Sequence, residues 1–298
     1  MTQMASHTDI GHRANLEDTA RAIQLRQVVP RKIDADILVL ADGAGGHRCG
    51  EVASTLGVDV VSSVLVAQLV TAPDEAVLRI GGGLTGVIEA AMDYANEVVV
   101  EKAAGANELS GMASTVVCIV IRDGVLYVAW AGDSRGYLYG DGRLRRITKD
   151  HSPVQRLIDL GLVNPAEAQS HPLSHIIDRY LGQPQGFVPE IGTYRILPGN
   201  VALVCSDGLT NVLSDDEIAA HIRFYQIGRC AFEELPVRLV EAALAAGTTD
   251  NVTVLCCEYD PAALLPVYPT EVTLTGAYPV ALSETFRTKK EIDHVATT

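Results

Sequence analysis

Residues 114–148 read STVVCIVIRDGVLYVAWAGDSRGYLYGDGRLRRIT. The stretch consists of short runs of β-branched, aliphatic and aromatic residues, and the dipeptides Asp123-Gly124 and Asp141-Gly142 each separate two runs. Asp-Gly between two such runs is a strong hairpin signal, because both residues tolerate the positive φ that tight hairpin turns require. The middle of the chain is therefore predicted to be an antiparallel meander.

Further elements are predicted on the N-terminal side of the meander. The apolar run from Asp36 to Asp42 (DILVLAD) predicts a buried strand that ends at Asp42 and presents that side chain from a rigid support. Apolar residues at helical spacing predict helices over residues 50–69 and 84–104.

The C-terminal half repeats the pattern of strands and helices. Ser214 to Glu217 matches a capping box that begins a helix, and strands are predicted near 201–205 and 252–258. Residues 151–190, which are rich in Gly, Pro and His, are expected to form short helices and a surface flap. This order favours an α+β fold in which helices cover an antiparallel sheet core.

The chain of 298 residues, 48% of them hydrophobic, is long enough to bury a large core. We expect one domain over residues 1–260, followed by a Pro- and Thr-rich tail of uncertain order over 261–298. Residues 272–282 in that tail are β-branched and apolar enough to pair with a sheet edge. The tail is therefore also a candidate docking element.

The net charge of −14 argues against a nucleic-acid or anionic-membrane partner, since both need a concentrated positive face. Bound divalent cations would account for the acidity, and plain solubility accounts for it equally well. No apolar run reaches the ~20 residues that a membrane span needs. The six cysteines form no CxxC pair and follow no signal peptide, which suggests reduced thiols and a cytoplasmic location.

Acidic residues recur beside apolar runs, where strands should end or turns begin: Glu17-Asp18, Asp42-Gly43, Asp133, Asp207-Gly208 and Asp250-Asn251. A strand that stops at Asp aims a carboxylate from a fixed position, and five such elements at one sheet edge could enclose hard cations. Each acid taken alone is more simply a turn residue. The argument for a metal site therefore rests on the set.

The chain contains six motifs, five of which carry these acids: Gly11-His-Arg13-Ala-Asn-Leu-Glu17-Asp18, Ala41-Asp42-Gly43-Ala-Gly-Gly46-His47, Gly111-Met-Ala-Ser-Thr115, Ala131-Gly-Asp-Ser-Arg135, Ser206-Asp-Gly-Leu209 and Thr249-Asp-Asn-Val-Thr253. With Thr148-Lys-Asp-His-Ser152 and His171-Pro172, they follow one another in family order over residues 8–259. In these motifs the chain resembles the metal-dependent protein phosphatases of the PP2C type, in particular the compact bacterial forms.

The resemblance implies a four-layer α-β-β-α sandwich of two antiparallel sheets flanked by helices. It implies hydrolysis of phosphoserine and phosphothreonine in phosphorylated proteins, among them a bacterial Ser/Thr kinase or its substrates, by a cytoplasmic monomer. Two Mn²⁺ or Mg²⁺ ions are implied, with Asp42 bridging them, the Gly43 carbonyl on one of them, and Asp207 and Asp250 completing the ligands of the first ion. Glu17 and Asp18 are expected to act through coordinated waters, and Asp133 with Asp207 is expected to form a third, weaker site.

All-oxygen ligation suits Mg²⁺ or Mn²⁺ and gives no reason to expect Zn²⁺. Water shared by two cations loses a proton easily, so a bridging hydroxide is expected to attack phosphorus without a phospho-enzyme. Arg13 occupies the family's phosphate-binding position and can meet two phosphate oxygens; the alternative is a surface ion pair with Glu17 or Asp18. We expect Arg135 to hold the loop of Asp133.

Two residues depart from the family pattern. Leu16 stands where many bacterial members have Asn, and Ala44 stands where animal members carry the His that protonates the leaving alkoxide. No histidine in the sequence is placed at the leaving group, since His47 is expected to point along the start of a helix. Asp178 in the flap is interpreted as a solvated carboxylate, with a third metal as the alternative.

Three other functional readings stay open at this point. A catalytically dead member would bind phosphoproteins without hydrolysis, but the three central aspartates are all present. A small phosphorylated metabolite could replace the protein substrate, because the metal centre acts on the phosphoryl group and the surroundings choose the rest. The tail could dock the protein into a signalling or secretion assembly.

Overall fold

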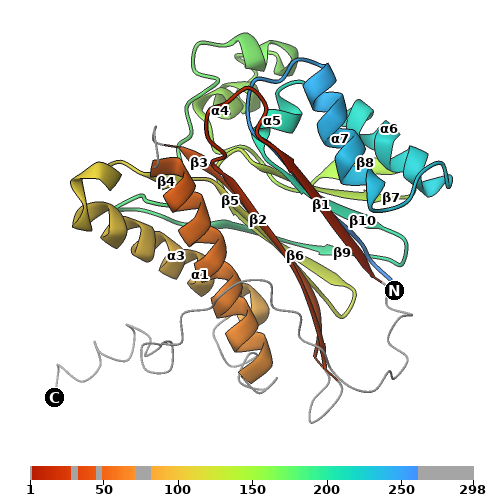
Figure 1. Ribbon diagram of the computed structural model, residues 1–298, viewed down its shortest axis with the longest axis horizontal. Coiled ribbons are helices and arrows are strands. Elements are labelled where there is room, and N and C mark those ends of the chain that lie inside the picture. The colour runs from red at the N-terminus through yellow and green to blue at the C-terminus, as the bar shows by residue number, and fades with distance from the viewer. Residues whose placement is uncertain (1, 28–32, 45–48, 72–81, 261–298) are drawn as a thin grey trace.

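Two antiparallel sheets pack face to face, and helices cover both outer faces (Figure 1). The structure is a computed structural model that describes residues 2–27, 33–44, 49–71 and 82–260. One sheet has the strand order β1 (Gln3–Asp9), β11 (Val252–Glu258), β10 (Val201–Cys205), β7 (Arg135–Gly140) and β8 (Arg143–Arg146). The other has the order β2 (Asp18–Gln27), β3 (Ile33–Ala44), β5 (Val116–Arg122), β6 (Val125–Ala131) and β9 (Glu190–Arg195), with the short β4 (Ala113–Ser114) paired to β3.

The helices fall into three groups. On the sheet that contains β3 lie α1 (Cys49–Thr71) and α3 (Gly83–Gly105), followed by the 3-10 turn η1 (Asn107–Leu109). On the other sheet lie α5 (Asp207–Thr210), α6 (Asp215–Gln226) and α7 (Glu234–Ala245). The flap contains α4 (Pro153–Asp159) and the 3-10 turn η2 (Pro165–Ser170), above one end of the strands in Figure 1. The predicted α+β four-layer sandwich is confirmed.

The inner strands are apolar throughout because both of their faces are buried. In β3, Ile37 and Val39 pack under the helices, whereas Leu38 and Leu40 point into the space between the sheets. The same alternation in β5, β10 and β11 builds three buried clusters, one at each contact between layers. The domain therefore has a helix-to-sheet core on each side and a sheet-to-sheet core in the middle.

The predicted meander is wrong in one respect. The hairpins are present, and Asp123 and Asp141 both adopt φ of 52° at their turns. However, the hairpin β5–β6 belongs to one sheet and β7–β8 to the other. The chain crosses between the sheets at 132–134, where Gly132 has φ of 117°. Asp133 consequently lies at the crossover point.

Several elements were not identified from the sequence. The edge strands β1 and β9 and the helix α7 were missed. Helix α1 has the length and composition of a membrane span, although Glu51 and Asp59 interrupt its apolar residues, so it is not one continuous apolar run. Such a helix is weak evidence for a membrane, because core helices pass the same test, and one face of α1 packs against β3. The predicted tail, 261–298, lies outside the described residues.

A leucine in the middle core should contribute far more to stability than an exposed one. Leu40 is fully buried between the sheets, whereas Leu160 in the flap is 71% exposed. Leu40→Ala is expected to lower the free energy of unfolding by about 2–5 kcal/mol, because it leaves a cavity that the two sheets cannot close. Leu160→Ala should change it by less than about 0.5 kcal/mol. Urea denaturation of both variants checks this, and equal destabilisation would contradict the assignment of the core.

Candidate metal and phosphate site

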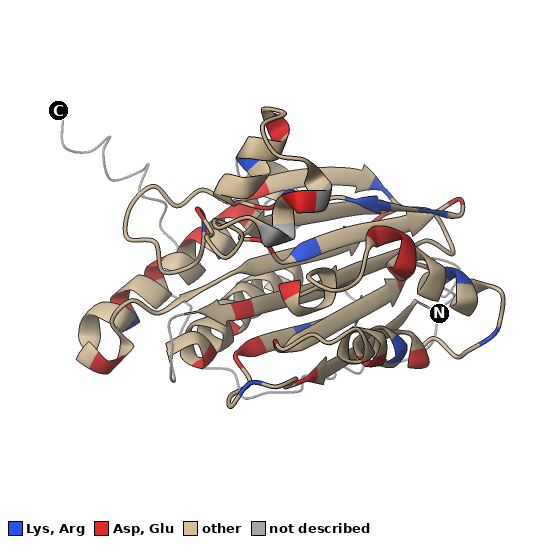
Figure 2. Ribbon diagram, turned by 90° about the horizontal axis from the view of Figure 1, so that it is seen from above, with Lys and Arg blue, Asp and Glu red and all other residues tan. Residues whose placement is uncertain are grey.

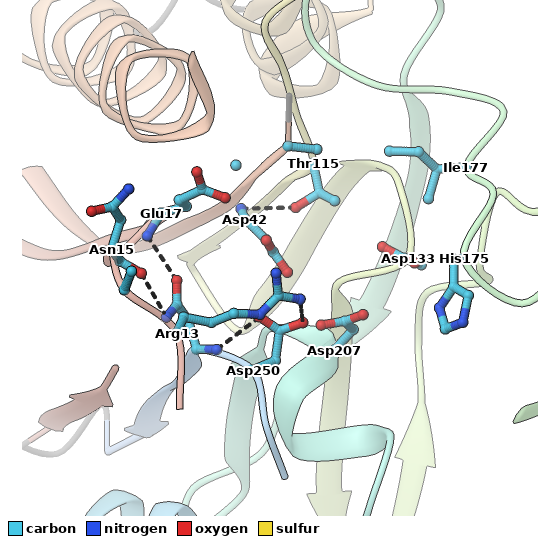
Figure 3. A pocket seen from close by; sticks show the side chains of 14 residues that line it. Arg13, Asn15, Glu17, Asp42, Thr115, Asp133, His175, Ile177, Asp207 and Asp250 are labelled. Carbon is cyan, nitrogen blue, oxygen red and sulfur yellow. Dashed lines mark hydrogen bonds and ion pairs between the residues drawn. The ribbon is translucent and has the colours of Figure 1, made fainter. Parts of the chain in front are cut away.

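One pocket of about 470 Å³ collects most of the predicted site residues at the end of the sandwich nearest the flap (Figure 3). Its wall contains seven of them: Arg13, Glu17, Asp42, Gly43, Asp133, Asp207 and Asp250. They come from the β1–β2 loop, the end of β3, the crossover after β6, the start of α5 and the turn before β11. The predicted convergence of separate acidic elements on one place is thus observed.

Asp42 is held by its backbone, which leaves its carboxylate available. Its N–H donates to Thr115 Oγ1 at 3.0 Å, and its carbonyl accepts from Thr115 N at 2.8 Å and from Ser114 Oγ at 2.9 Å. At the next residue, a Cβ on Gly43 would lie 2.2 Å from the carbonyl oxygen of Gly50. Gly43 is therefore required because the first turn of α1 packs directly against the backbone here.

Asp207 and Asp250 both have partners in the protein, and one partner of Asp250 is the N–H of Asn251, which donates to its Oδ1 at 2.9 Å. Asn211, one turn further along, donates from Nδ2 to Asp207 Oδ2 at 2.9 Å. Arg13 Nη2 pairs with Asp250 Oδ2 at 2.6 Å, and the Arg13 side chain is 56% exposed. The alternative partners of Arg13 considered from the sequence, Glu17 and Asp18, are not the ones it contacts.

Asn251 is a positioning residue that sequence reasoning missed. Its Oδ1 accepts from Glu17 N at 2.7 Å, and its Nδ2 donates to the carbonyls of Ile10 at 2.8 Å and Asn15 at 3.1 Å. It thereby fixes the loop that carries Arg13 and Glu17. The signal was the Asp-Asn dipeptide in the last motif, which was interpreted only as a turn.

Asp18 lies below the pocket, outside its lining. It stands opposite Asp42 in the β2–β3 register and is buried. Ser206 Oγ donates to Asp18 Oδ2 at 2.8 Å, whereas Oδ1 of Asp18 has no hydrogen-bond partner among the described groups. A buried carboxylate oxygen with no donor is costly unless a cation, a coordinated water or a proton satisfies it.

The carboxylates raise one another's pKa values. Burial is the largest cause for Asp18, whose pKa rises to about 7, with repulsion from Asp207 and Asp250 adding to it. Burial, then Asp207 and Asp150, raise the pKa of Asp133 to about 7. The pKa of Asp42 is raised well above its ordinary value by burial and then by Asp18 and Asp207.

The same causes act on the remaining two acids of the group. The pKa of Asp207 is raised by burial first and by the charge of Asp250 next. Burial also raises the pKa of Glu17, with smaller increases from Asp250 and Glu51 and a decrease from Arg13. One partly exposed guanidinium, which already pairs with Asp250, cannot neutralise these five acids as well, so the group needs either protons or cations.

The donor set fits hard divalent cations. All its ligand atoms are oxygens, and Asp18 Oδ1 is unpartnered. Within the described residues no three His, Cys, Asp or Glu side chains already converge as a ligand cage, because Asp250 is turned to Arg13 and Asp207 to Asn211. Mg²⁺ commonly binds through one or two carboxylates and keeps several waters, so such a cage is not required.

Three residues of the crossover and flap are placed by the structure. Arg135 contacts Asp150 through Nε at 3.1 Å and Nη2 at 2.8 Å, and that it holds the loop of Asp133 stays a prediction. Asp178 forms an ion pair with Arg156 and does not line the pocket. His175 from the flap does line it, near Asp133 (Figure 3). No sequence signal distinguished His175, and His47 lies outside the described residues.

Known proteins with similar sequences and structures agree with this geometry. The family model for protein phosphatase 2C matches residues 29–245. Serine/threonine protein phosphatase PstP of Mycobacterium tuberculosis is 35% identical over 246 residues, which are 83% of this chain and 42% of PstP. The chain thus spans about two fifths of the length of that relative. Serine/threonine phosphatase stp of Listeria monocytogenes is 33% identical over 239 residues, covering 78% of this chain and 88% of stp.

A solved structure of a serine/threonine phosphatase is also similar to this chain. The crystal structure of the catalytic domain of PstP in complex with two manganese ions is 34% identical, with a TM-score of 0.70, and the match covers 86% of this chain and 97% of that domain. The sandwich, the motif order and the clustered carboxylates are explained together by common descent. This chain belongs to the protein phosphatase 2C family.

Proposed function

We propose that this protein is a metal-dependent phosphatase that removes phosphate from phosphoserine and phosphothreonine in other proteins. The observation that carries the proposal is the meeting of Asp42, Asp133, Asp207 and Asp250 with Arg13 in one pocket. Negative oxygen ligands for cations and one mobile positive group for a phosphate dianion are what phosphoryl transfer to water requires. Relatives named as serine/threonine phosphatases support the choice of substrate.

Mn²⁺ or Mg²⁺ is the proposed cofactor. Asp42, the Gly43 carbonyl, Asp207 and Asp250 would hold two ions, and Asp133 with Asp207 would hold a third. Support comes from the all-oxygen donor set and from the two manganese ions in the PstP structure. When bound, such cations supply charge neutralisation and an activated water. Asp18 and Glu17 would bind waters of the same shells.

The chain's own residues then bind and orient the phosphate. Arg13 is exposed and its partner Asp250 is itself a proposed ligand, so the guanidinium can turn to two phosphate oxygens. Asn251 keeps the Arg13 loop against the site, and Thr115 keeps Asp42 in place. His175 and Ile177 close the side of the pocket that faces the flap.

The proposed partners and cellular location of this protein rest on the same resemblance to the family. We infer that phosphorylated proteins, including a Ser/Thr kinase or its targets, are the partners, and that the protein is a monomer in the cytoplasm. All six cysteines are free thiols, which suits a reducing compartment. Lys and Arg are scattered over the described surface rather than gathered on one face, which does not favour nucleic acid (Figure 2).

The test is phosphate release from a phosphothreonine peptide, with and without Mn²⁺, by the natural protein and by Asp42→Asn. We expect Mn²⁺-dependent release that falls on the order of 100-fold or more in the variant, because a direct ligand should matter more than the outer partners whose loss costs about 10–100-fold. Asp123→Asn, at an exposed turn carboxylate, is the matched control.

The outcomes separate the alternatives. Release that the Asp42 variant retains would remove the proposed mechanism. No release with any divalent cation would favour a binding protein without activity. Faster release from small phosphorylated metabolites than from phosphopeptides would replace the protein substrate with a small one.

Arg13→Ala should chiefly raise KM for a charged phosphopeptide. It removes a charge-assisted contact to the phosphate that is present before and during the reaction, and we expect KM to rise about 10-fold. The KM of Arg13→Lys should lie between those of the natural protein and Arg13→Ala, since a lysine keeps the charge and loses the two-pronged geometry of the guanidinium. Steady-state kinetics at saturating Mn²⁺ measure this. A fall in kcat alone, with KM unchanged, is the result that would rule out phosphate binding by Arg13.

A further inference from the structure

His151 lies between two parts of the pocket wall that are far apart in sequence. It belongs to the motif Thr148-Lys-Asp-His-Ser152, in the segment between β8 and α4, and it does not line the pocket. Its side chain is 9% exposed and stacks on Trp130, with ring centroids 5.9 Å apart and an interplanar angle of 6°.

On one side, His151 forms hydrogen bonds with the crossover loop that carries Asp133. The His151 N–H donates to the Gly132 carbonyl at 2.9 Å, and the Gly132 N–H donates to Nδ1 of the imidazole at 3.2 Å. Both hydrogen-bonding groups of Gly132 are thus paired with one residue. The Gly132 backbone also packs against Thr115, where a Cβ on the glycine would lie 2.7 Å from the threonine side chain.

On the other side, His151 holds the flap. Its carbonyl accepts from Asp178 N at 2.8 Å, directly after Ile177, which lines the pocket. The remaining ring nitrogen, Nε2, contacts Glu190 Oε2 at 3.1 Å on β9. Because Nδ1 accepts from Gly132, the proton must be on Nε2, and Glu190 fixes that tautomer.

We propose that His151 is a positioning residue that connects the Asp133 loop to the flap. It thereby fixes the position of Asp133, a proposed cation ligand, relative to the wall of the pocket that the flap forms. The essential group is the acceptor nitrogen Nδ1, with the backbone of the same residue making the flap contact. If that acceptor is lost, the N–H of the buried Gly132 has no partner and the loop loosens. The flap segment is then held less firmly, because the His151 carbonyl that accepts from Asp178 N is no longer fixed.

Two substitutions distinguish positioning from simple packing. His151→Phe keeps a ring to stack on Trp130 and removes the acceptor, whereas His151→Asn removes the ring and keeps an acceptor oxygen close to where Nδ1 lies. A positioning role predicts that Asn preserves function and Phe loses it. A packing role predicts the reverse. His171→Phe is the control, because Nδ1 of His171 accepts from Leu173 within the flap, and no bond to the crossover loop is present among the described residues.

Two readouts on the full chain test the proposal. Amide hydrogen exchange, read by mass spectrometry, should increase in His151→Phe for peptides over both 130–135 and 175–182, and stay near the natural level in His151→Asn and His171→Phe. The Mn²⁺ concentration for half-maximal phosphopeptide hydrolysis should rise about 10-fold in His151→Phe, as is typical when an outer partner of a ligand is lost.

The exchange readout is independent of activity, while the Mn²⁺ readout rests on the proposed function. If the natural protein releases no phosphate, the proposed function fails and hydrogen exchange still decides the role of His151. Faster exchange in only one of the two segments, or in neither, would overturn the proposal. The proposal would also be overturned if His151→Asn lost the slow exchange and the natural Mn²⁺ requirement while His151→Phe retained both.

Discussion

The crowding of carboxylates at one end of the sandwich is the constraint on which the rest of the site depends. Asp18, Asp42, Asp133 and Asp207 share a small volume, and burial together with mutual repulsion raises all four pKa values. For Asp18 and Asp133 the rise is from 3.8 to about 7, so between these pH values the folded chain binds more protons than the unfolded one. Stability from these groups is therefore lost as pH rises through that window, and a cation restores it by taking the place of the protons.

The fold supplies the rigidity that this crowding needs. β2 and β3 place Asp18 opposite Asp42, and the ends of β6 and β10 lead directly into Asp133 and Asp207. The segments that carry the carboxylates are positioned by hydrogen bonds from neutral side chains, namely those of Thr115, Ser206, Asn211 and Asn251. Since none of these groups carries a charge, they position the acids without neutralising them, and Arg13 remains the exposed positive group that can turn to phosphate.

The sequence predicted the local features well and the non-local ones poorly. Asp42 at the end of an apolar strand, the Asp-Gly hairpins and the Ser214 capping box depend on a few adjacent residues, and each is present. The transfer of the chain from one sheet to the other at Gly132 could not be predicted, because it depends on contacts with Thr115 and His151. For the same reason Asp178 was considered for the site and His175 was not, since which flap residue faces the pocket is decided by Arg156 and His151.

In the metal-free protein the crowded acids hold protons, and bound cations displace them. Calorimetric titration of Mn²⁺ into the metal-free protein, in buffers of different ionisation enthalpy, counts the protons released on binding. We expect a release that grows as pH is lowered from about 8 to about 6, because Asp18 and Asp133 have pKa values of about 7. The release should shrink in Asp133→Asn. Mn²⁺ binding that releases no protons anywhere in this range would show that the acids do not hold them.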